Sequence, residues 1–223
     1  MKKIFSIAID GPAGAGKSTV AKALAKRLNA QYLDTGAMYR TVGLYFLRRD
    51  LADDATQVAK LAQDMDIAIR FEGDAQHMLL DGEDVTEAIR QSEASRAASQ
   101  VSAVPEVRER LVRLQRETAR GTAIVMDGRD IGTKVLPNAD LKIYLTATCE
   151  VRALRRYAEL RGKGQTPVYH EVLDDIVERD YNDMHRAASP LCRATDARLL
   201  DNTALTLDEV LDTACEMARE AGI

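Results

Sequence analysis

The sequence predicts an α/β fold in which helices cover both faces of a parallel β-sheet. Two observations predict this fold. Short apolar runs typical of buried strands alternate with amphipathic helical segments, and a glycine-rich turn joins the first strand to the first helix. The chain has 223 residues, of which 46% are hydrophobic and 30% charged. This length and composition are typical of one globular domain with an insertion rather than of a disordered chain.

Five short apolar runs are the predicted strands of the sheet. In chain order they are Ile4–Ile9, Gln31–Leu33, Thr122–Met126, Leu141–Leu145 and Ala197–Leu200. The third run ends in the motif "AIVMDGRDIGT", which contains Asp127, Arg129 and Asp130. Ligands of parallel sheets bind at the carboxyl ends of the strands, so these three charged residues are candidates for a binding site.

Three helices are predicted from apolar periodicity and end signals. The first spans Ser18–Leu28, and the second spans Pro105 to about Ala119, where Pro105 suits the first turn. The third begins at "TLDE", residues 206–209, which is a capping-box pattern. The side chains of this third helix that we expect to face inward are Leu207, Val210, Leu211, Ala214 and Met217.

One segment breaks the alternation of strands and helices. Asp66–Val85 reads as short strands, with Asp81 and Gly82 as a hairpin turn. We therefore expect a small β-rich insertion, and a decoration of the protein surface is the alternative interpretation.

Charge, hydropathy and cysteine usage argue against several functions. The net charge is −4, so any anion site must be a local basic patch, and we expect no nucleic acid polymer as a partner. No apolar run approaches the roughly 20 residues of a membrane span. Cys149, Cys192 and Cys215 form no CxxC pair, which predicts reduced thiols in a cytoplasmic protein. The three histidines show no metal-ligand spacing.

The strongest motif is "IAIDGPAGAGKST", which places the pattern G-x-x-x-x-G-K-[ST] between a strand and an amphipathic helix. Backbone N–H groups of such a turn, together with the positive end of the helix, hold a polyphosphate. Lys17 would reach the β- and γ-phosphates, and the Ser18 hydroxyl would be a ligand of Mg²⁺. The predicted ATP-binding residues are Gly11, Pro12, Ala13, Gly14, Ala15, Gly16, Lys17, Ser18 and Thr19.

This phosphate-binding loop does not by itself define a reaction. The chain lacks the N-K-x-D motif by which GTPases read guanine, and it is short for a remodelling ATPase. A compact domain with many arginines outside the loop favours a kinase of a small phosphorylated acceptor. Two other interpretations remain open: a kinase for an acceptor such as AMP, UMP or shikimate, and a regulatory or assembly protein that uses ATP only as a switch.

Arginines recur at positions suited to a second phosphate. The motif "LDTGAMYR" places Tyr39 and Arg40 early on the helix after the second strand. The motif "ERDYNDMHRAASPL" places three charged residues at i, i+4 and i+7 on one face of a predicted helix: Arg179, Asp183 and Arg186. Such a stripe is also typical of a solvated face. Its coexistence with the phosphate loop and Arg129 favours a binding role.

The motifs together give a specific resemblance. "GPAGAGKST", "LDTGAMYR", "AASQVSAVPEVRERL", "DGRDIGT" and "ERDYNDMHRAASPL" occur in the order typical of bacterial cytidylate kinases, a family of nucleoside monophosphate (NMP) kinases that the sequence resembles over nearly its whole length. The resemblance implies a P-loop kinase fold with a five-stranded parallel sheet and a closing helical lid. It also implies transfer of the ATP γ-phosphoryl group to CMP or dCMP. The implied regions are a core at about 1–35, 104–148 and 188–223, an NMP-binding region with the β-rich insertion at about 36–103, and the lid at about 149–187.

The same resemblance implies roles for individual residues. The acceptor phosphate would be bound by Arg40, Arg129 and Arg186. The cytosine would be read by Ser99, Arg108 and Asp130, and the ribose side would be lined by Tyr39, Arg179 and Asp183, with Thr35 as a further substrate-binding residue. In the lid, Arg152, Arg155, Arg156, Arg161 and Lys163 outnumber Glu150 and Glu159. The implied catalytic residues are Lys17, Arg129, Arg155, Arg156 and Arg186. Ser18 and Asp127 are the predicted metal-site residues, and Asp127, at the end of its strand, would order Mg²⁺-bound water or Lys17.

Physical chemistry is consistent with these roles. Asp130 can accept from the exocyclic amine of cytosine while Arg108 or Ser99 donates to its ring nitrogen and carbonyl. Uracil has an acceptor where cytosine has its exocyclic amine donor, and a donor where cytosine has its ring-nitrogen acceptor. Buried mismatches of this kind cost about 1–3 kcal/mol each. The attacking phosphate oxygen is already anionic, so charge neutralisation and positioning are needed rather than a general base. We expect a monomer whose partners are small molecules.

Overall fold

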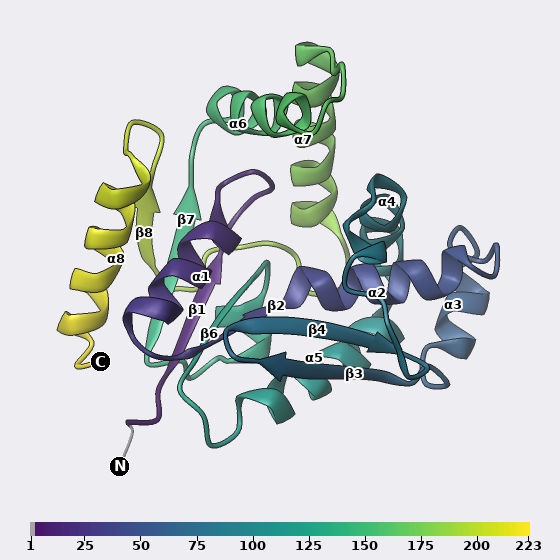
Figure 1. The fold of residues 1–223 in the computed structure, drawn as a ribbon, viewed down its shortest axis with the longest axis horizontal. Helices are drawn as coiled ribbons and strands as arrows, with labels where there is room; N and C mark the ends of the chain where they lie inside the picture. The colour runs from purple at the N-terminus through teal and green to yellow at the C-terminus, as the bar shows by residue number, and fades with distance from the viewer. Residues whose placement is uncertain (1–2) are drawn as a thin grey trace.

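The computed structural model describes residues 3–223, and five of its strands form one parallel sheet in the order β2-β6-β1-β7-β8 (Figure 1). These strands are β1 (Ser6–Asp10), β2 (Gln31–Asp34), β6 (Ile124–Gly128), β7 (Leu141–Thr146) and β8 (Arg198–Asp201). All four pairings are parallel, which confirms the predicted sheet, and each strand lies within two residues of its predicted bounds. Residues 1 and 2 of the predicted core lie outside the described residues.

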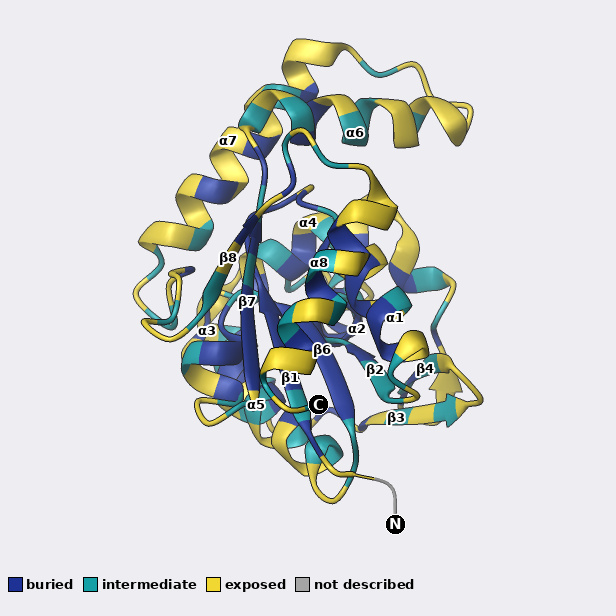
Figure 2. Ribbon diagram, turned by 90° about the vertical axis from the view of Figure 1, so that its left-hand side faces the viewer, coloured by how far each residue is buried: buried dark blue, intermediate teal, exposed yellow. Residues whose placement is uncertain are grey.

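Helices pack on both faces of this sheet, and its three central strands, β6, β1 and β7, are deeply buried (Figure 2). The packing helices are α1 (Lys17–Arg27), α2 (Thr35–Leu47), α5 (Pro105–Ala119) and α8 (Leu207–Glu220). Successive residues of a strand point to opposite faces. Ala8 and Met126 accordingly pack with α2 and α5, whereas Ile7 and Val125 pack with α1 and α8. Within residues 3–223, no helix has both the length and the apolar character needed to traverse a bilayer.

The C-terminal helix begins where the capping box predicted. Thr206 accepts from the Glu209 backbone N–H, and the Glu209 side chain accepts from the Thr206 backbone N–H. The prediction that Leu207 faces inward was wrong, because its side chain is 47% exposed. Residues 206–209 are all exposed, so the buried stripe of α8 starts one turn into the helix, at Val210.

The predicted insertion, Asp66–Val85, forms a three-stranded antiparallel sheet beside α2, with strands β3 (Ile67–Glu72), β4 (Ala75–Leu80) and β5 (Glu83–Asp84). Short helices that were not predicted flank it: α3 (Ala55–Leu61), the 3₁₀ helix η1 (Ala88–Arg90) and α4 (Ser92–Val101). The hairpin turn at Asp81 and Gly82 is confirmed, and both residues have the positive φ that a type I′ turn requires. Met78 and Leu80 are buried in the same cluster as Phe46 of α2. The insertion therefore shares the core with α2 and is not a peripheral decoration.

Two helices rise above the carboxyl edge of the sheet, at the top of Figure 1. They are α6 (Cys149–Gly162) and α7 (Tyr169–His185), within the predicted lid. Arg179 and Asp183 lie on α7 as predicted, but the helix ends at His185, so Arg186 does not belong to it. Arg186 has extended backbone angles because the chain turns there. Its N–H still donates to the Asn182 carbonyl at 3.0 Å, which keeps its side chain near Asp183.

Helices α2 and α4 cross at a glycine. A Cβ atom on Gly43 would lie 2.8 Å from the backbone nitrogen of Ala98 and 3.1 Å from the carbonyl oxygen of Ala94. Backbone atoms cannot move aside as the end of a flexible side chain can, so the crossing needs glycine. Because α2 carries Tyr39 and Arg40 and α4 carries Ser99, this crossing sets the spacing of predicted substrate-binding residues.

We expect Gly43→Ala to lower the free energy of unfolding by about 1–3 kcal/mol through overpacking at this crossing. Urea denaturation followed by circular dichroism measures the change. Gly162→Ala is the matched control, because Gly162 ends α6 and an added Cβ would meet no described atom within 4 Å. Equal unfolding midpoints for the two variants would contradict this account of the helix crossing.

Candidate active site

A cavity of about 530 Å³ opens at the carboxyl end of the sheet, where β6 lies between β2 and β1. It brings together most of the predicted site residues from segments far apart in the chain. Those that line it are Ala13, Gly14, Gly16, Lys17, Ser18, Thr19, Thr35, Tyr39, Arg40, Ser99, Arg108, Asp127, Arg129, Asp130, Arg156, Arg179, Asp183 and Arg186. Gly11, Pro12, Ala15 and Arg155 are not among its lining residues.

The glycine-rich turn follows β1 and ends at the first turn of α1. A Cβ atom on Gly11 would lie 2.0 Å from the Leu145 carbonyl oxygen, so only glycine lets the turn pass this close to β7. Gly16 is the N-cap of α1 with left-handed angles, and no side chain caps this helix end. The first N–H groups of α1 are therefore left without side-chain acceptors beside the cavity. A helix start of this kind is a ready site for an anion.

Lys17 lies folded against this turn. Its side chain is buried, and its Nζ donates to the Pro12 carbonyl at 2.7 Å. Burial lowers the pKa of Lys17, and the nearby charge of Arg129 lowers it further, whereas Asp127 and Asp183 act in the opposite direction. An anionic phosphate in the cavity would favour the protonated ammonium. The protonated form of Lys17 is therefore more favourable when the cavity holds a polyanion than when it is empty.

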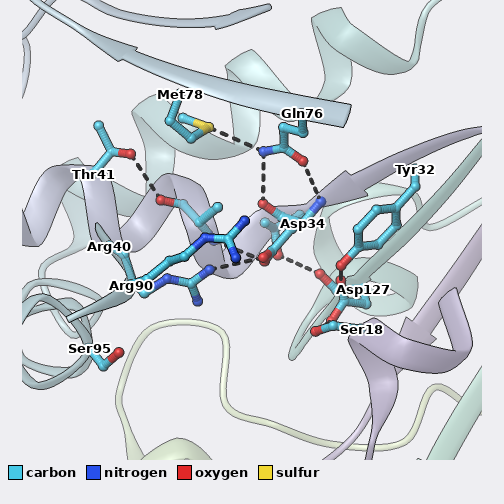
Figure 3. A network of polar contacts seen from close by, with 12 residues as sticks. Ser18, Tyr32, Asp34, Arg40, Thr41, Gln76, Met78, Arg90, Ser95 and Asp127 are labelled. Carbon is cyan, nitrogen blue, oxygen red and sulfur yellow. Dashed lines mark hydrogen bonds and ion pairs between the residues drawn. The ribbon is translucent and has the colours of Figure 1, made fainter. Parts of the chain in front are cut away.

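Ser18 and Asp127 line the cavity together with Lys17. They form a pair of hard oxygen donors whose side chains meet (Figure 3). The Ser18 hydroxyl donates to Asp127 Oδ2 at 2.8 Å, and the Tyr32 hydroxyl donates to Oδ1 at 2.8 Å. Burial raises the pKa of Asp127, and the charge of Asp34 raises it further. A hydroxyl and one carboxylate suit Mg²⁺, which keeps several waters and takes few protein ligands. Sequence analysis missed Tyr32, because nothing in the strand motif "QYLD" marks its hydroxyl as a partner of Asp127.

Three arginines also line the cavity, and carboxylates orient them. Asp183 accepts from Arg129 Nε at 2.7 Å and pairs with Arg186 at 3.5 Å. Burial alone would raise the pKa of Asp183, but the charge and hydrogen bond of Arg129 lower it. Arg40 is held in the same manner by Asp34, at 2.9 Å. These ion pairs hold the three cations in the cavity that the phosphate loop also lines.

A buried ion pair also lines the cavity. Arg108 and Asp130 are paired, and their side chains are 4% and 5% exposed. Arg108 also lies 5.3 Å from the centroid of the Tyr39 ring. Asp10, at the end of β1, accepts from the backbone N–H groups of Ile131 and Gly132 at 2.8 and 2.7 Å, which fixes the loop that carries Asp130.

Sequence analysis also missed Asp10. Its signal was a carboxylate at a strand end directly before the glycine-rich turn. Burial raises its pKa to about 6, although the two backbone hydrogen bonds oppose this rise. Asp10 links the strand that leads into the phosphate loop to the loop that holds Asp130.

Three buried polar atoms on residues that line the cavity lack a hydrogen-bond partner in the described part of the chain. They are Tyr39 Oη, Arg108 Nε and Arg186 Nη2, and none has a hydrogen bond within residues 3–223. An unsatisfied buried donor costs about 1–3 kcal/mol. All three residues line the same cavity and can donate. A ligand with several hydrogen-bond acceptors would supply partners for these donors.

The basic residues of the predicted lid divide into structural and cavity-lining ones. Arg152 is buried, pairs with Asp180 of α7 at 2.6 Å and donates to the Ala13 carbonyl at 2.8 Å. It therefore joins α6 and α7 to the phosphate loop. Arg155 donates to Asn202 rather than lining the cavity, whereas Arg156 lines it beside Glu159.

A glycine-rich phosphate loop and a group of arginines line one cavity at the carboxyl edge of a parallel sheet. This combination defines a P-loop kinase of a small acceptor. The family model described as cytidylate kinase matches residues 7–220, and the chain belongs to this family of nucleoside monophosphate kinases. The resemblance seen in the sequence motifs is thereby confirmed.

Individual relatives agree with this assignment. The chain is 53% identical over 218 residues to a cytidylate kinase of Caldicellulosiruptor bescii, covering 97% of this chain and 96% of that protein. It is 49% identical over 223 residues to a cytidylate kinase of Ligilactobacillus salivarius, covering 99% of both. An uncharacterized protein from Eubacterium ventriosum of known crystal structure shares the fold, with a TM-score of 0.55, 14% identity and coverage of 98% and 99%.

Proposed function

We propose that this protein transfers the γ-phosphoryl group of ATP to CMP or dCMP, giving ADP and CDP or dCDP. The observation that carries the proposal is the set of unpaired buried donors on Tyr39, Arg108 and Arg186, three residues that line the same cavity as the phosphate loop. A nucleoside monophosphate would supply acceptors for such donors. The identity to cytidylate kinases supports the choice of cytosine as the base.

In this proposal the donor triphosphate lies along the turn from Gly11 to Thr19, with Lys17 reaching its terminal phosphates. Ser18 and Asp127 would hold Mg²⁺, which neutralises charge on the β- and γ-phosphates when bound. Arg40, Arg129 and Arg186 would bind the acceptor phosphate, and Arg156 would neutralise charge from the lid. Arg155 would join it only by leaving Asn202, to which it donates in this structure.

The remaining site residues would bind the nucleoside. Asp130, Arg108 and Ser99 would read the cytosine, while Tyr39, Arg179, Asp183 and Thr35 would line the sugar side. Because the attacking oxygen is an anionic phosphate oxygen, the protein has to align two polyanions and offset their repulsion. We further propose a cytoplasmic monomer that acts on free nucleotides.

A steady-state panel tests this function. ADP release with ATP and Mg²⁺ is measured with CMP, dCMP, UMP, AMP or shikimate as the acceptor. We expect CMP and dCMP to give the highest kcat/KM. A preference for any other acceptor would replace the substrate assignment, and tight ATP binding without acceptor-stimulated ADP release would indicate a nucleotide switch instead.

A further inference from the structure

Strand β2 is at one edge of the parallel sheet and pairs only with β6 there. Its last residue, Asp34, would have an unpaired backbone N–H and C=O on the outer side. Gln76 of the insertion satisfies both groups: its Oε1 accepts from the Asp34 N–H at 2.7 Å, and its Nε2 donates to the Asp34 carbonyl at 3.2 Å (Figure 3). The side-chain amide of Gln76 thus takes the place of one residue of a neighbouring strand.

The Asp34 side chain connects this fixed backbone to the active site, because its carboxylate contacts α2 and Arg40. Asp34 Oδ1 accepts from the Ala37 N–H at 2.9 Å, which caps α2. Asp34 Oδ2 accepts from Arg40 Nη2 at 2.9 Å, so both oxygens are engaged. A Cβ atom on Gly36 would lie 3.0 Å from Arg40 Nη1 and 3.1 Å from Asp34 Oδ1, so glycine leaves room for this ion pair.

The amide of Gln76 has one orientation that satisfies these contacts. Its oxygen must face the Asp34 N–H, and its NH₂ group must face the Asp34 carbonyl. The same NH₂ group donates to the Met78 sulfur at 3.1 Å, which adds a second partner on β4 itself. Gln76 is partly buried, and Met78 is part of the core shared with α2. The side-chain amide of Gln76 is therefore fixed to the packed insertion.

We propose that Gln76 is a positioning residue for the acceptor phosphate, acting through Asp34 on Arg40. The inference rests on the proposed function, because it requires Arg40 to bind that phosphate. It gives the β-rich insertion a role in catalysis without contact to either nucleotide. Loss of the hydrogen bonds between Gln76 and the Asp34 backbone raises the free-energy cost of ordering Arg40 when the acceptor nucleotide binds. It leaves the binding of ATP at the phosphate loop unchanged.

The first test compares Gln76→Ala with Gln57→Ala. Gln57 lies on α3 in the same region, and its side chain makes no hydrogen bond to another described residue. We expect Gln76→Ala to raise KM for CMP about five- to tenfold, as the loss of one or two hydrogen bonds would. KM for ATP and kcat should stay within about twofold, and the thermal midpoint within about 2 °C, which is less than 1 kcal/mol for a domain of this size. Gln57→Ala should match the wild type throughout.

A double-mutant cycle with Arg40→Ala then tests the route of the effect. If Gln76 acts through Arg40, adding Gln76→Ala to Arg40→Ala changes KM for CMP by less than about twofold. Full multiplication of the two effects would overturn the inference. So would a wild-type KM for CMP in Gln76→Ala, or equal rises in KM for CMP and ATP with a large fall in thermal midpoint. If the proposed function is wrong, the wild type itself will show ADP release that neither CMP nor dCMP stimulates. That result would overturn both the proposed function and the inference about Gln76.

Discussion

Lys17→Ala is expected to lower kcat with ATP and CMP by at least about 150-fold, which corresponds to about 3 kcal/mol of transition-state stabilisation by analogy with the loss of an oxyanion donor. Lys17 is the cation of the phosphate loop itself and lies beside the Ser18 and Asp127 pair. Negative charge on the transferred group and on the leaving phosphate would lose its nearest protein partner. Alanine cannot replace a donor at that position.

The same substitution should not destabilise the fold. Burial and Arg129 lower the pKa of Lys17, so removal of the ammonium relieves a desolvation cost in the ligand-free protein. We expect an unchanged or higher thermal midpoint together with the loss of activity. Lys22→Ala, at an exposed position on the same helix, is the matched control and should retain full activity. Wild-type turnover by Lys17→Ala would contradict the role of the loop.

Local patterns in the sequence predicted the frame of this molecule well. The helix Pro105–Ala119, the capping box at Thr206 and the hairpin turn at Asp81 all depend on residues close together in the chain, and all three are confirmed. The phosphate loop is equally local. The end of α7 was predicted less well, since the arginine stripe continued to Arg186 while the helix stopped at His185.

Contacts between distant segments could not be predicted from such patterns. Tyr32 meets Asp127, Gln76 meets Asp34, and Asp10 holds the loop after Asp130, each across tens of residues. Arg152 illustrates the reverse problem. It belongs to a basic helix whose sequence suggests one shared role, but only the packing of α6 on α7 shows that its partner is Asp180. Residue type identified the charges of the site, and the tertiary structure decides which of them remain available to a ligand.

Asp130→Ala is expected to reduce the preference for CMP over UMP by about 10- to 100-fold, because the proposed acceptor for the cytosine amine is lost, a change of about 1–3 kcal/mol. KM for CMP should rise while KM for ATP stays within about threefold. The ratio of kcat/KM for CMP to that for UMP is the decisive measurement, since it does not depend on the fraction of enzyme that is folded.

This independence matters because Asp130 has a second partner. Arg108 is buried against it, and removal of one member of a buried pair leaves an uncompensated charge that costs about 3–5 kcal/mol. Asp130→Asn keeps the volume and one acceptor oxygen, so it should fold better while still lowering the CMP preference. Asp196→Ala removes the carboxylate partner of another buried cation, Lys142, outside the cavity lining, and serves as the control for a lost ion pair. It should leave the CMP-to-UMP ratio unchanged. Equal losses for CMP and ATP in both Asp130 variants would show that Asp130 supports the fold of the site and does not read the base.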